Sequence, residues 1–177
     1  MSNPKITEDP RLDPRLKAIF GQMPASAAED VTNREELLAR ANSPEAMEAS
    51  AGLRGLLEMC DTEEIAPSKG LRVETYEFKS KPDGNDVKIQ LIRHDDDEPR
   101  PAVYYIHGGG MQIMSCFDSN YRAWGKMIAA QGVQVAMVDF RNCVTASSAP
   151  EVAPYPAGLN DCVSGLEWVS ENAARLG

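Results

Sequence analysis

The sequence predicts an α/β fold. Two short apolar runs, Ala102–Ile106 and Val133–Val138, have the length and composition of strands that are buried on both faces of a sheet. A helical pattern of apolar residues separates the two runs, and a second helical pattern follows the later one. Strand, helix, strand and helix in this order are typical of a right-handed parallel α/β unit.

Two further strands are predicted before this unit. Residues 71–78 and residues 87–92 each alternate apolar and polar side chains, which is the pattern of a half-buried strand. The residues between them, Lys81-Pro82-Asp83-Gly84-Asn85-Asp86, have strong turn chemistry. The two strands are therefore expected to pair as an antiparallel hairpin.

Helices and loops are predicted for residues 1–66. A short helix is expected over residues 15–20, and a second one is expected from Asn33 to about Ala41. A third helix is expected to begin with Ser43 as its N-cap and Pro44 at its first position, and to end near Cys60.

Two more helices accompany the apolar runs. The helix that starts after Asp118 is expected to turn a set of large side chains inward, and Trp168 in the last helix is also expected in the core. The inward set is Tyr121, Trp124, Met127 and Ile128. In the last helix, apolar residues recur at positions 159, 163, 166, 169 and 173.

Composition narrows the function further. The 177 residues include 18 Lys and Arg and 27 Asp and Glu, which gives a net charge of −9 and argues against nucleic acid or an anionic membrane surface as a partner. No apolar stretch approaches the ~20 residues that cross a bilayer, and the first residues lack the apolar part of a signal peptide. The four cysteines show no C-x-x-C spacing and the only histidines are His94 and His107. We therefore expect a cytoplasmic protein with reduced thiols and no metal site.

One motif points to chemistry. His107-Gly108-Gly109-Gly110 follows the first apolar run directly. Consecutive glycines can turn the backbone sharply and expose two N–H groups to one point, which is the geometry of an oxyanion hole. A tight turn also uses glycine for purely structural reasons, so the motif alone leaves both interpretations open. The segment matches neither of the glycine patterns that cradle phosphates, which makes a nucleotide site the weaker interpretation.

The surrounding motifs carry a family resemblance. Val138-Asp139-Phe140-Arg141-Asn142 lies about thirty residues further along, and a segment rich in Ser, Pro and Ala over residues 147–157 precedes Asp161 and Trp168. Together with the glycine motif, these segments resemble the bacterial hormone-sensitive-lipase family of α/β hydrolases over about residues 70–177. The resemblance implies the N-terminal portion of an α/β-hydrolase fold: a helical cap and the first strands of a mostly parallel sheet, in the order 1-2-4-3.

The resemblance also implies a site and an activity. In that family this glycine loop supplies oxyanion-hole amides, which the motif places at Gly109 and Gly110, with His107 and Gly108 supporting the loop and Met111 beside the substrate. Residues 1–66 are expected to be the cap region, and residues 67–177 the N-terminal part of the catalytic domain. The implied function is hydrolysis of carboxylic esters of short or medium acyl chains, without a cofactor.

The sequence also departs from the family pattern. No G-x-S-x-G nucleophile motif is present: the nearest segment, Cys162-Val163-Ser164-Gly165-Leu166, lacks two of its glycines and lies inside a predicted helix. Both histidines precede every position that the nucleophile could take, although the family order is Ser, acid, His. We therefore expect the N-terminal part of a longer hydrolase, which ends before the nucleophile and is inactive alone. Its partner would be the C-terminal half, in the same or a companion chain, and a homo-oligomer stays open.

Two alternatives remain at this point. One is a non-catalytic binding module on a truncated hydrolase-like fold. The other is a different α/β enzyme that uses the glycine turn to hold a phosphate. Activated serine chemistry in the intact protein would separate the leading interpretation from both.

Overall fold

The computed structural model describes residues 3–22, 30–96 and 98–177. These form two compact units, Met1–Asn33 and Arg34–Gly177. The first unit holds two short helices, α1 (Pro4–Thr7) and α2 (Pro14–Phe20). The Asp13 carboxylate caps α2 by accepting a 2.8 Å hydrogen bond from the backbone N–H of Arg15. The short helix predicted over residues 15–20 is thus confirmed.

The second unit opens with two helices, α3 (Arg34–Ala41) and α4 (Pro44–Glu58). Ser43 Oγ accepts a 3.2 Å hydrogen bond from the backbone N–H of Ala46, so the predicted N-cap of α4 is confirmed. The helix ends two residues earlier than predicted. Of the predicted cap region, 1–66, residues 1–2 and 23–29 lie outside the described part of the chain, and the division at residue 66 stays a prediction.

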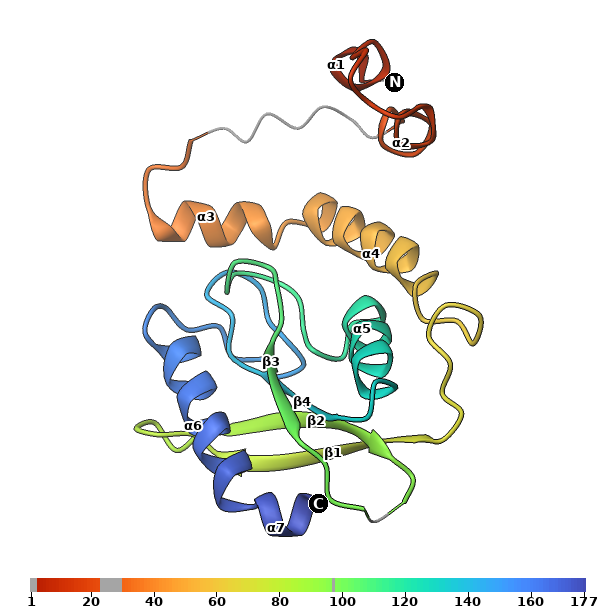
Figure 1. The fold of residues 1–177 in the computed structure, drawn as a ribbon. Coiled ribbons are helices and arrows are strands. Elements are labelled where there is room, and N and C mark those ends of the chain that lie inside the picture. Colours follow the sequence, from red (N-terminus) through yellow and green to blue (C-terminus); the bar gives the residue numbers. More distant parts are fainter. Residues whose placement is uncertain (1–2, 23–29, 97) are drawn as a thin grey trace. The chain divides into compact units, whose positions relative to one another are not determined.

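A four-stranded sheet forms the centre of the second unit (Figure 1). Its strands are β1 (Leu71–Lys79), β2 (Asp86–His94), β3 (Ala102–Ile106) and β4 (Gln134–Asp139), in the order β1-β2-β4-β3. The β1–β2 and β2–β4 pairs are antiparallel and the β3–β4 pair is parallel. The predicted hairpin and the strand order 1-2-4-3 are therefore confirmed. This part of the sheet is mixed, with one parallel pair among the described strands.

Helices cover both faces of the sheet. Side chains of β4 alternate: Val135 and Met137 join the apolar cluster on the side of α5 (Ser119–Ala129), whereas Ala136 and Val138 join the cluster that includes residues of α6 (Ala157–Glu171) and α7 (Ala173–Leu176). All six residues of β4 are buried. The prediction that this run is a strand buried on both faces is confirmed.

The same prediction is wrong for β3. This strand lies at the edge of the sheet and pairs only with β4 among the described strands. Val103 is 37% exposed and Ile106 is 49% exposed. An apolar run indicates that a strand is suited to burial, but it does not indicate how many strands and helices lie against that strand.

Small residues make the closest contacts of α5 and α6 with the sheet. Tyr121 and Ile128 pack against the core as predicted, whereas the prediction is wrong for Trp124. Trp124 is 48% exposed, because α5 turns Ala123, Gly125 and Ala129 to the sheet. A Cβ at Gly125 would lie 2.8 Å from Ile92 Cδ1, so the absence of a side chain there lets the helix approach the sheet closely.

The helix α6 shows the same arrangement. The apolar residues that predict it include Leu159, Val163 and Leu166, which are about half exposed, while Cys162 and Gly165 are buried against the sheet. A side chain at Gly165 would overlap the Tyr104 hydroxyl. Trp168 packs against the core as predicted, with its ring stacked 5.9 Å from that of Phe78.

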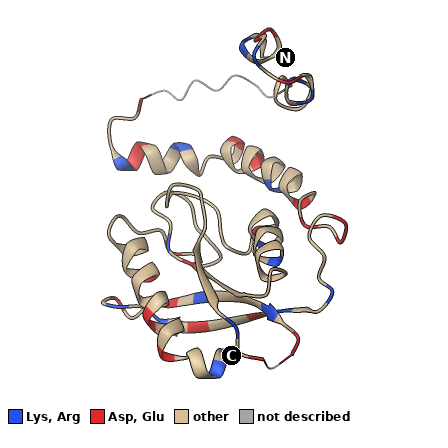
Figure 2. Cartoon of the chain, viewed as in Figure 1, with Lys and Arg blue, Asp and Glu red and all other residues tan. Residues whose placement is uncertain are grey.

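Charged residues of both signs are distributed over the described part of the chain (Figure 2). Figure 2 shows Lys and Arg scattered among Asp and Glu in the part of the chain that the structure describes, without one basic face in this view. None of the described helices combines the length and the apolar character needed to cross a bilayer.

Candidate active site

The glycine motif lies at the carboxyl end of the parallel strand pair. His107 begins the loop that follows β3, and the last residue pair of the β3–β4 ladder is Ile106 with Val138. The loop after β3 and the loop after β4 therefore start side by side. In α/β sheets, ligands bind at the carboxyl ends of the strands, so the motif occupies the expected position for a site.

The backbone of the loop requires glycine at one position in particular. Gly109 has φ +107° and Gly110 has φ +64°. A Cβ at Gly109 would overlap the backbone oxygen of Ile113, whereas a Cβ at Gly110 would meet nothing closer than Gln112 Nε2 at 3.7 Å. Gly109 is thus fixed by both conformation and space, and Gly110 by conformation alone.

The N–H groups of this turn remain available. Among the described residues, neither the Gly109 N–H nor the Gly110 N–H donates a hydrogen bond to a protein acceptor. The Gly109 carbonyl, by contrast, accepts hydrogen bonds from the N–H groups of Gln112 (3.0 Å) and Ile113 (3.3 Å). Two adjacent amides without partners can stabilise an oxygen that gains negative charge.

Two residues that follow the glycine turn have strained backbone conformations. Met111 and Met114 are not glycines, yet their φ angles are +57° and +78°. A left-handed conformation costs about 1–2 kcal/mol for such a residue. Hydrogen bonds from the loop after β4 hold both: the Cys143 N–H donates to the Met111 carbonyl (2.9 Å), and Asn142 Nδ2 donates to the Met114 carbonyl (2.7 Å).

His107 lies beneath the turn. Its ring is 3% exposed and stacks on Phe140 with centroids 4.3 Å apart. Its Nδ1 lies 2.8 Å from the Gly108 carbonyl, and because a carbonyl only accepts, Nδ1 carries the proton in this bond. Burial lowers the pKa of His107, which favours the neutral ring. The ring therefore acts as a packed, neutral hydrogen-bond donor to the loop.

Met111 borders a hollow next to the turn. The hollow measures about 250 Å³ and is mostly apolar. Its lining residues are Gly110, Met111, Arg141, Cys143, Ala153, Tyr155, Gly158 and Leu159. The structure thus brings Met111 and Gly110 to one cavity, while His107 is buried behind the turn.

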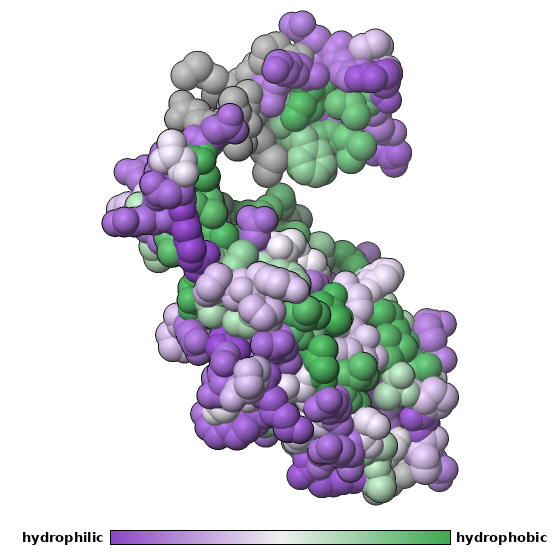
Figure 3. Space-filling view, turned by 90° about the vertical axis from the view of Figure 1, so that its left-hand side faces the viewer, coloured by the Kyte–Doolittle hydropathy of each residue, from purple (hydrophilic) through white to green (hydrophobic). Residues whose placement is uncertain are grey.

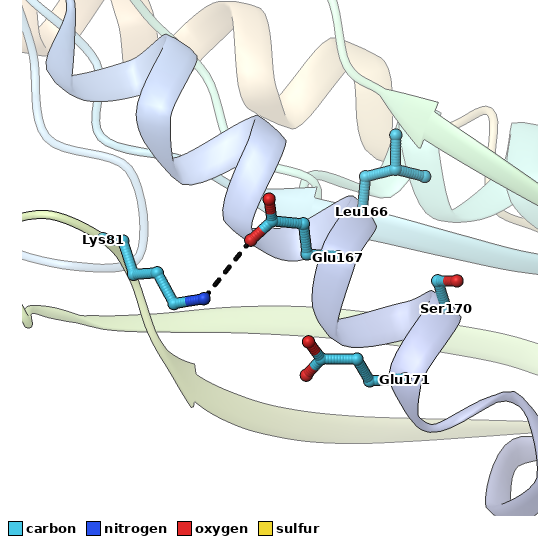
Figure 4. Close-up of a pocket in the computed structure, with 5 residues that line it drawn as sticks. All are labelled: Lys81, Leu166, Glu167, Ser170 and Glu171. Carbon is cyan, nitrogen blue, oxygen red and sulfur yellow. Dashed lines mark hydrogen bonds and ion pairs between the residues drawn. The ribbon is translucent and has the colours of Figure 1, made fainter.

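A larger hollow lies elsewhere. Figure 4 shows it beside the C-terminal half of α6, where the Lys81 ammonium reaches toward the Glu167 carboxylate at 3.4 Å. Its volume is about 500 Å³. Glu167 follows Gly158 by nine helical residues, or about 13 Å of helix rise, so this surface hollow is separate from the glycine turn.

A buried ion pair fixes the loop after β4. The Arg141 guanidinium donates through Nε to Asp161 Oδ2 (2.8 Å), and Asp161 also accepts hydrogen bonds from the Arg141 backbone N–H (3.0 Å) and from Ser80 Oγ (2.6 Å). Both side chains are at least 97% buried. Burial alone would raise the pKa of Asp161, but the hydrogen bonds from Arg141 and Ser80 outweigh it and leave that pKa lowered.

The sequence interpretation did not single out Asp139 or Asn142 as site residues. Both belong to the segment that follows the second apolar run, and both contact the loop that follows the first. The available signal was position: polar residues directly after adjacent parallel strands gather at one edge of the sheet.

Comparison with known proteins agrees with this geometry. Residues 103–177 match a family model described as alpha/beta hydrolase fold. Carboxylesterase NlhH of Mycobacterium tuberculosis is 42% identical over 77 residues, which are 44% of this chain and 22% of that protein. The structure of esterase Est22 matches with a TM-score of 0.93 and 60% identity, over 99% of this chain and 51% of that chain.

A third match connects the chain to a narrower group. Brefeldin A esterase, described as a bacterial homologue of human hormone-sensitive lipase, matches with a TM-score of 0.73 and 27% identity, over 99% of this chain and 45% of that chain. The chain spans about half the length of these solved relatives.

These findings show that the chain has the N-terminal portion of the α/β-hydrolase fold. Within this class it is similar to the hormone-sensitive-lipase-like esterases, and the resemblance that the motifs predicted is confirmed.

The Arg141–Asp161 pair gives a stability prediction. It is best measured in a chimera in which residues 1–177 replace the matching half of Est22, since the two match over 99% of this chain. Asp161→Asn should lower the free energy of unfolding by about 3 kcal/mol or more, because it leaves a buried guanidinium without its main partner. Because the pKa of Asp161 is lowered in the folded state, this stabilisation is present above about pH 4 and is lost as the pH falls through the folded value.

Asp83 provides the matched control. It also pairs with Arg141 (2.9 Å), but its side chain is 48% exposed. Asp83→Asn should change the free energy of unfolding by less than about 1 kcal/mol. Urea denaturation at pH 7 and at a pH well below 4 measures both variants, and the effect of Asp161→Asn should shrink at the lower pH. Equal effects of the two substitutions would contradict the assignment of Asp161 as the principal partner.

Proposed function

We propose that residues 1–177 supply the oxyanion hole of a carboxylic ester hydrolase that acts on short or medium acyl chains. The observation that carries this proposal is the pair of unpartnered N–H groups at Gly109 and Gly110, held in a strained turn at the carboxyl end of β3. The kinship with NlhH, a carboxylesterase, and with the esterase Est22 supports the same reaction class.

The proposed chemistry divides between this chain and the rest of the hydrolase. A serine outside these 177 residues would attack the ester carbonyl, and its proton would pass to a histidine that an acid orients. The carbonyl oxygen becomes negatively charged in the tetrahedral intermediate, and the N–H groups of Gly109 and Gly110 would donate hydrogen bonds to it. Collapse of the intermediate then expels the alcohol, to which the histidine returns its proton, and leaves the acyl group on the serine. A water molecule that gives its proton to the same histidine would then attack this acyl group. Collapse of the second tetrahedral intermediate would release the carboxylic acid and restore the serine.

The loop geometry suits this role. Amides fixed before the reaction need no reorganisation when charge develops, which is the source of their effect. The stacked His107 and the hydrogen bonds to Met111 and Met114 would keep the turn in place. Met111 would contact the substrate from the adjoining hollow.

The chimera tests the proposal. We expect it to hydrolyse p-nitrophenyl butyrate with saturation kinetics and to react with a fluorophosphonate, whereas residues 1–177 alone should show no turnover above a denatured control. Saturable turnover by the 177-residue chain alone, lost on mutation of one of its own serines, would contradict the proposed division of roles. A folded chimera that binds esters without cleaving them would favour the binding-module alternative.

A further inference from the structure

Asp139 is a buried carboxylate between two loops. It is the last residue of β4 and is 2% exposed. Among the described residues, no Lys or Arg forms an ion pair with it, in contrast to Asp161 and its partner Arg141. A buried carboxylate without a cation must be stabilised by hydrogen bonds, so the donors around Asp139 identify what it holds.

One carboxylate oxygen holds the loop that contains the glycine turn. Asp139 Oδ1 accepts hydrogen bonds from Ser115 Oγ (2.6 Å) and from the backbone N–H of Cys116 (3.3 Å). Ser115 directly follows Met114, the last of the strained residues. The bond therefore fixes the exit of the turn.

The other oxygen holds the loop after β4. Asp139 Oδ2 accepts hydrogen bonds from the backbone N–H of Ser148 (3.0 Å) and from Ser148 Oγ. The segment between these anchors contacts the turn a second time, because the N–H groups of Val144 and Thr145 donate to the Gln112 carbonyl (3.2 and 2.9 Å). The two loops are thus fastened together on both sides of residues 111–114.

We propose that Asp139 is a positioning residue: it locks the loop after β4 onto the glycine turn and so fixes the direction of the Gly109 and Gly110 amides. The inference rests on the proposed oxyanion role for its effect on catalysis. Its effect on loop structure does not depend on the oxyanion role, because the four hydrogen bonds to Asp139 hold the two loops whatever the Gly109 and Gly110 amides bind.

The test uses Asp139→Asn in the chimera. Asn keeps the shape of Asp, but its NH2 group only donates. It therefore takes the place of one accepting oxygen, and the donors on the side of either Ser148 or Ser115 and Cys116 lose their acceptor. We expect amide hydrogen exchange in peptides covering residues 108–115 to become at least about tenfold faster, with exchange in the β1–β2 hairpin unchanged. We expect kcat to fall roughly 10- to 100-fold with KM nearly unchanged, the signature of an interaction made in the transition state.

Two control variants and one milder variant are measured together with Asp139→Asn. Asp95→Asn and Ser170→Ala make the same chemical changes at exposed positions and should alter neither readout. Ser148→Ala removes one donor while keeping the backbone bond, and it should move both readouts in the same direction by less. If Asp139→Asn fails to fold, Ser148→Ala decides the question with the same two measurements.

Each outcome has a defined meaning. Unchanged exchange in residues 108–115 would overturn the proposal, whether kcat falls or not. Faster exchange confined to these residues supports it. If the loop exchanges faster while neither this variant nor a disrupted Gly109 changes kcat, positioning by Asp139 stands and the oxyanion role fails.

Discussion

Gly109→Ala is expected to lower kcat of the chimera by about 10²–10³-fold, the loss typical of removing one oxyanion-hole donor. The new Cβ would overlap the Ile113 backbone oxygen, and a φ of +107° is unsuited to alanine. The turn must therefore move, and the two amides lose their common direction. KM should change far less than kcat, because the lost hydrogen bonds form fully only in the transition state.

Gly110→Ala is the matched variant, since it makes the same substitution at the neighbouring residue. Its Cβ would meet nothing closer than 3.7 Å, and φ +64° lies in the left-handed region that non-glycine residues reach at modest cost. The N–H is retained in both variants. We expect Gly110→Ala to lower kcat less than about tenfold, which is much less than the loss on removal of one oxyanion-hole donor. Steady-state kinetics with p-nitrophenyl butyrate and circular dichroism measure both, and similar losses at the two positions would argue that the oxyanion binds elsewhere.

The sequence predicted most of the fold because local chemistry specified it. The turn residues 81–86 and the alternating strands beside them determine the β1–β2 hairpin, and Ser43 with Pro44 determines where α4 begins. The position of the glycine motif at the end of β3 also followed from the strand prediction alone. These features depend on neighbours within a few residues.

Other features depend on residues far apart in the chain, and periodicity does not report them. Large apolar side chains predicted Trp124 to face inward, but Gly125 packs against Ile92, and this contact becomes visible only when the strands are assembled. Likewise, Asp139 lies 24 residues from Ser115 along the chain, and the two meet only because β3 and β4 are parallel neighbours.

The second large effect concerns residues 1–177 as an isolated chain. Figure 3 views the molecule from the side on which α6 lies in Figure 1 and shows apolar side chains open at the surface there. Exposure of the large apolar residues of β3 and α6 is 37% for Val103, 49% for Ile106, 43% for Leu159, 50% for Val163 and 52% for Leu166. The strand β3 is also an edge, and an apolar edge with unpaired N–H and C=O groups is a template for association.

The free energy left unrealised at this exposed surface is comparable with the free energy of unfolding of a domain. Full burial of a large apolar side chain is worth roughly 1.5–3 kcal/mol, so half exposure leaves about 1 kcal/mol unrealised at each of the five positions. The sum approaches the lower end of the about 5–15 kcal/mol by which whole domains are stable. We therefore expect the isolated chain to self-associate and to lack a cooperative urea transition, and we expect the chimera to unfold cooperatively as a soluble protein.

Val163→Lys tests whether the exposed apolar face causes the association. It should improve the behaviour of the isolated chain but destabilise the chimera. In the isolated chain it replaces an exposed apolar group on α6 with a charge and should reduce association, measured by light scattering. In the chimera, where we expect the same face to be covered, it should lower the free energy of unfolding by about 2 kcal/mol or more, because it buries a charge. A soluble monomer of residues 1–177 with a cooperative transition of several kcal/mol would show that this part of the fold is stable without further burial of β3 and α6.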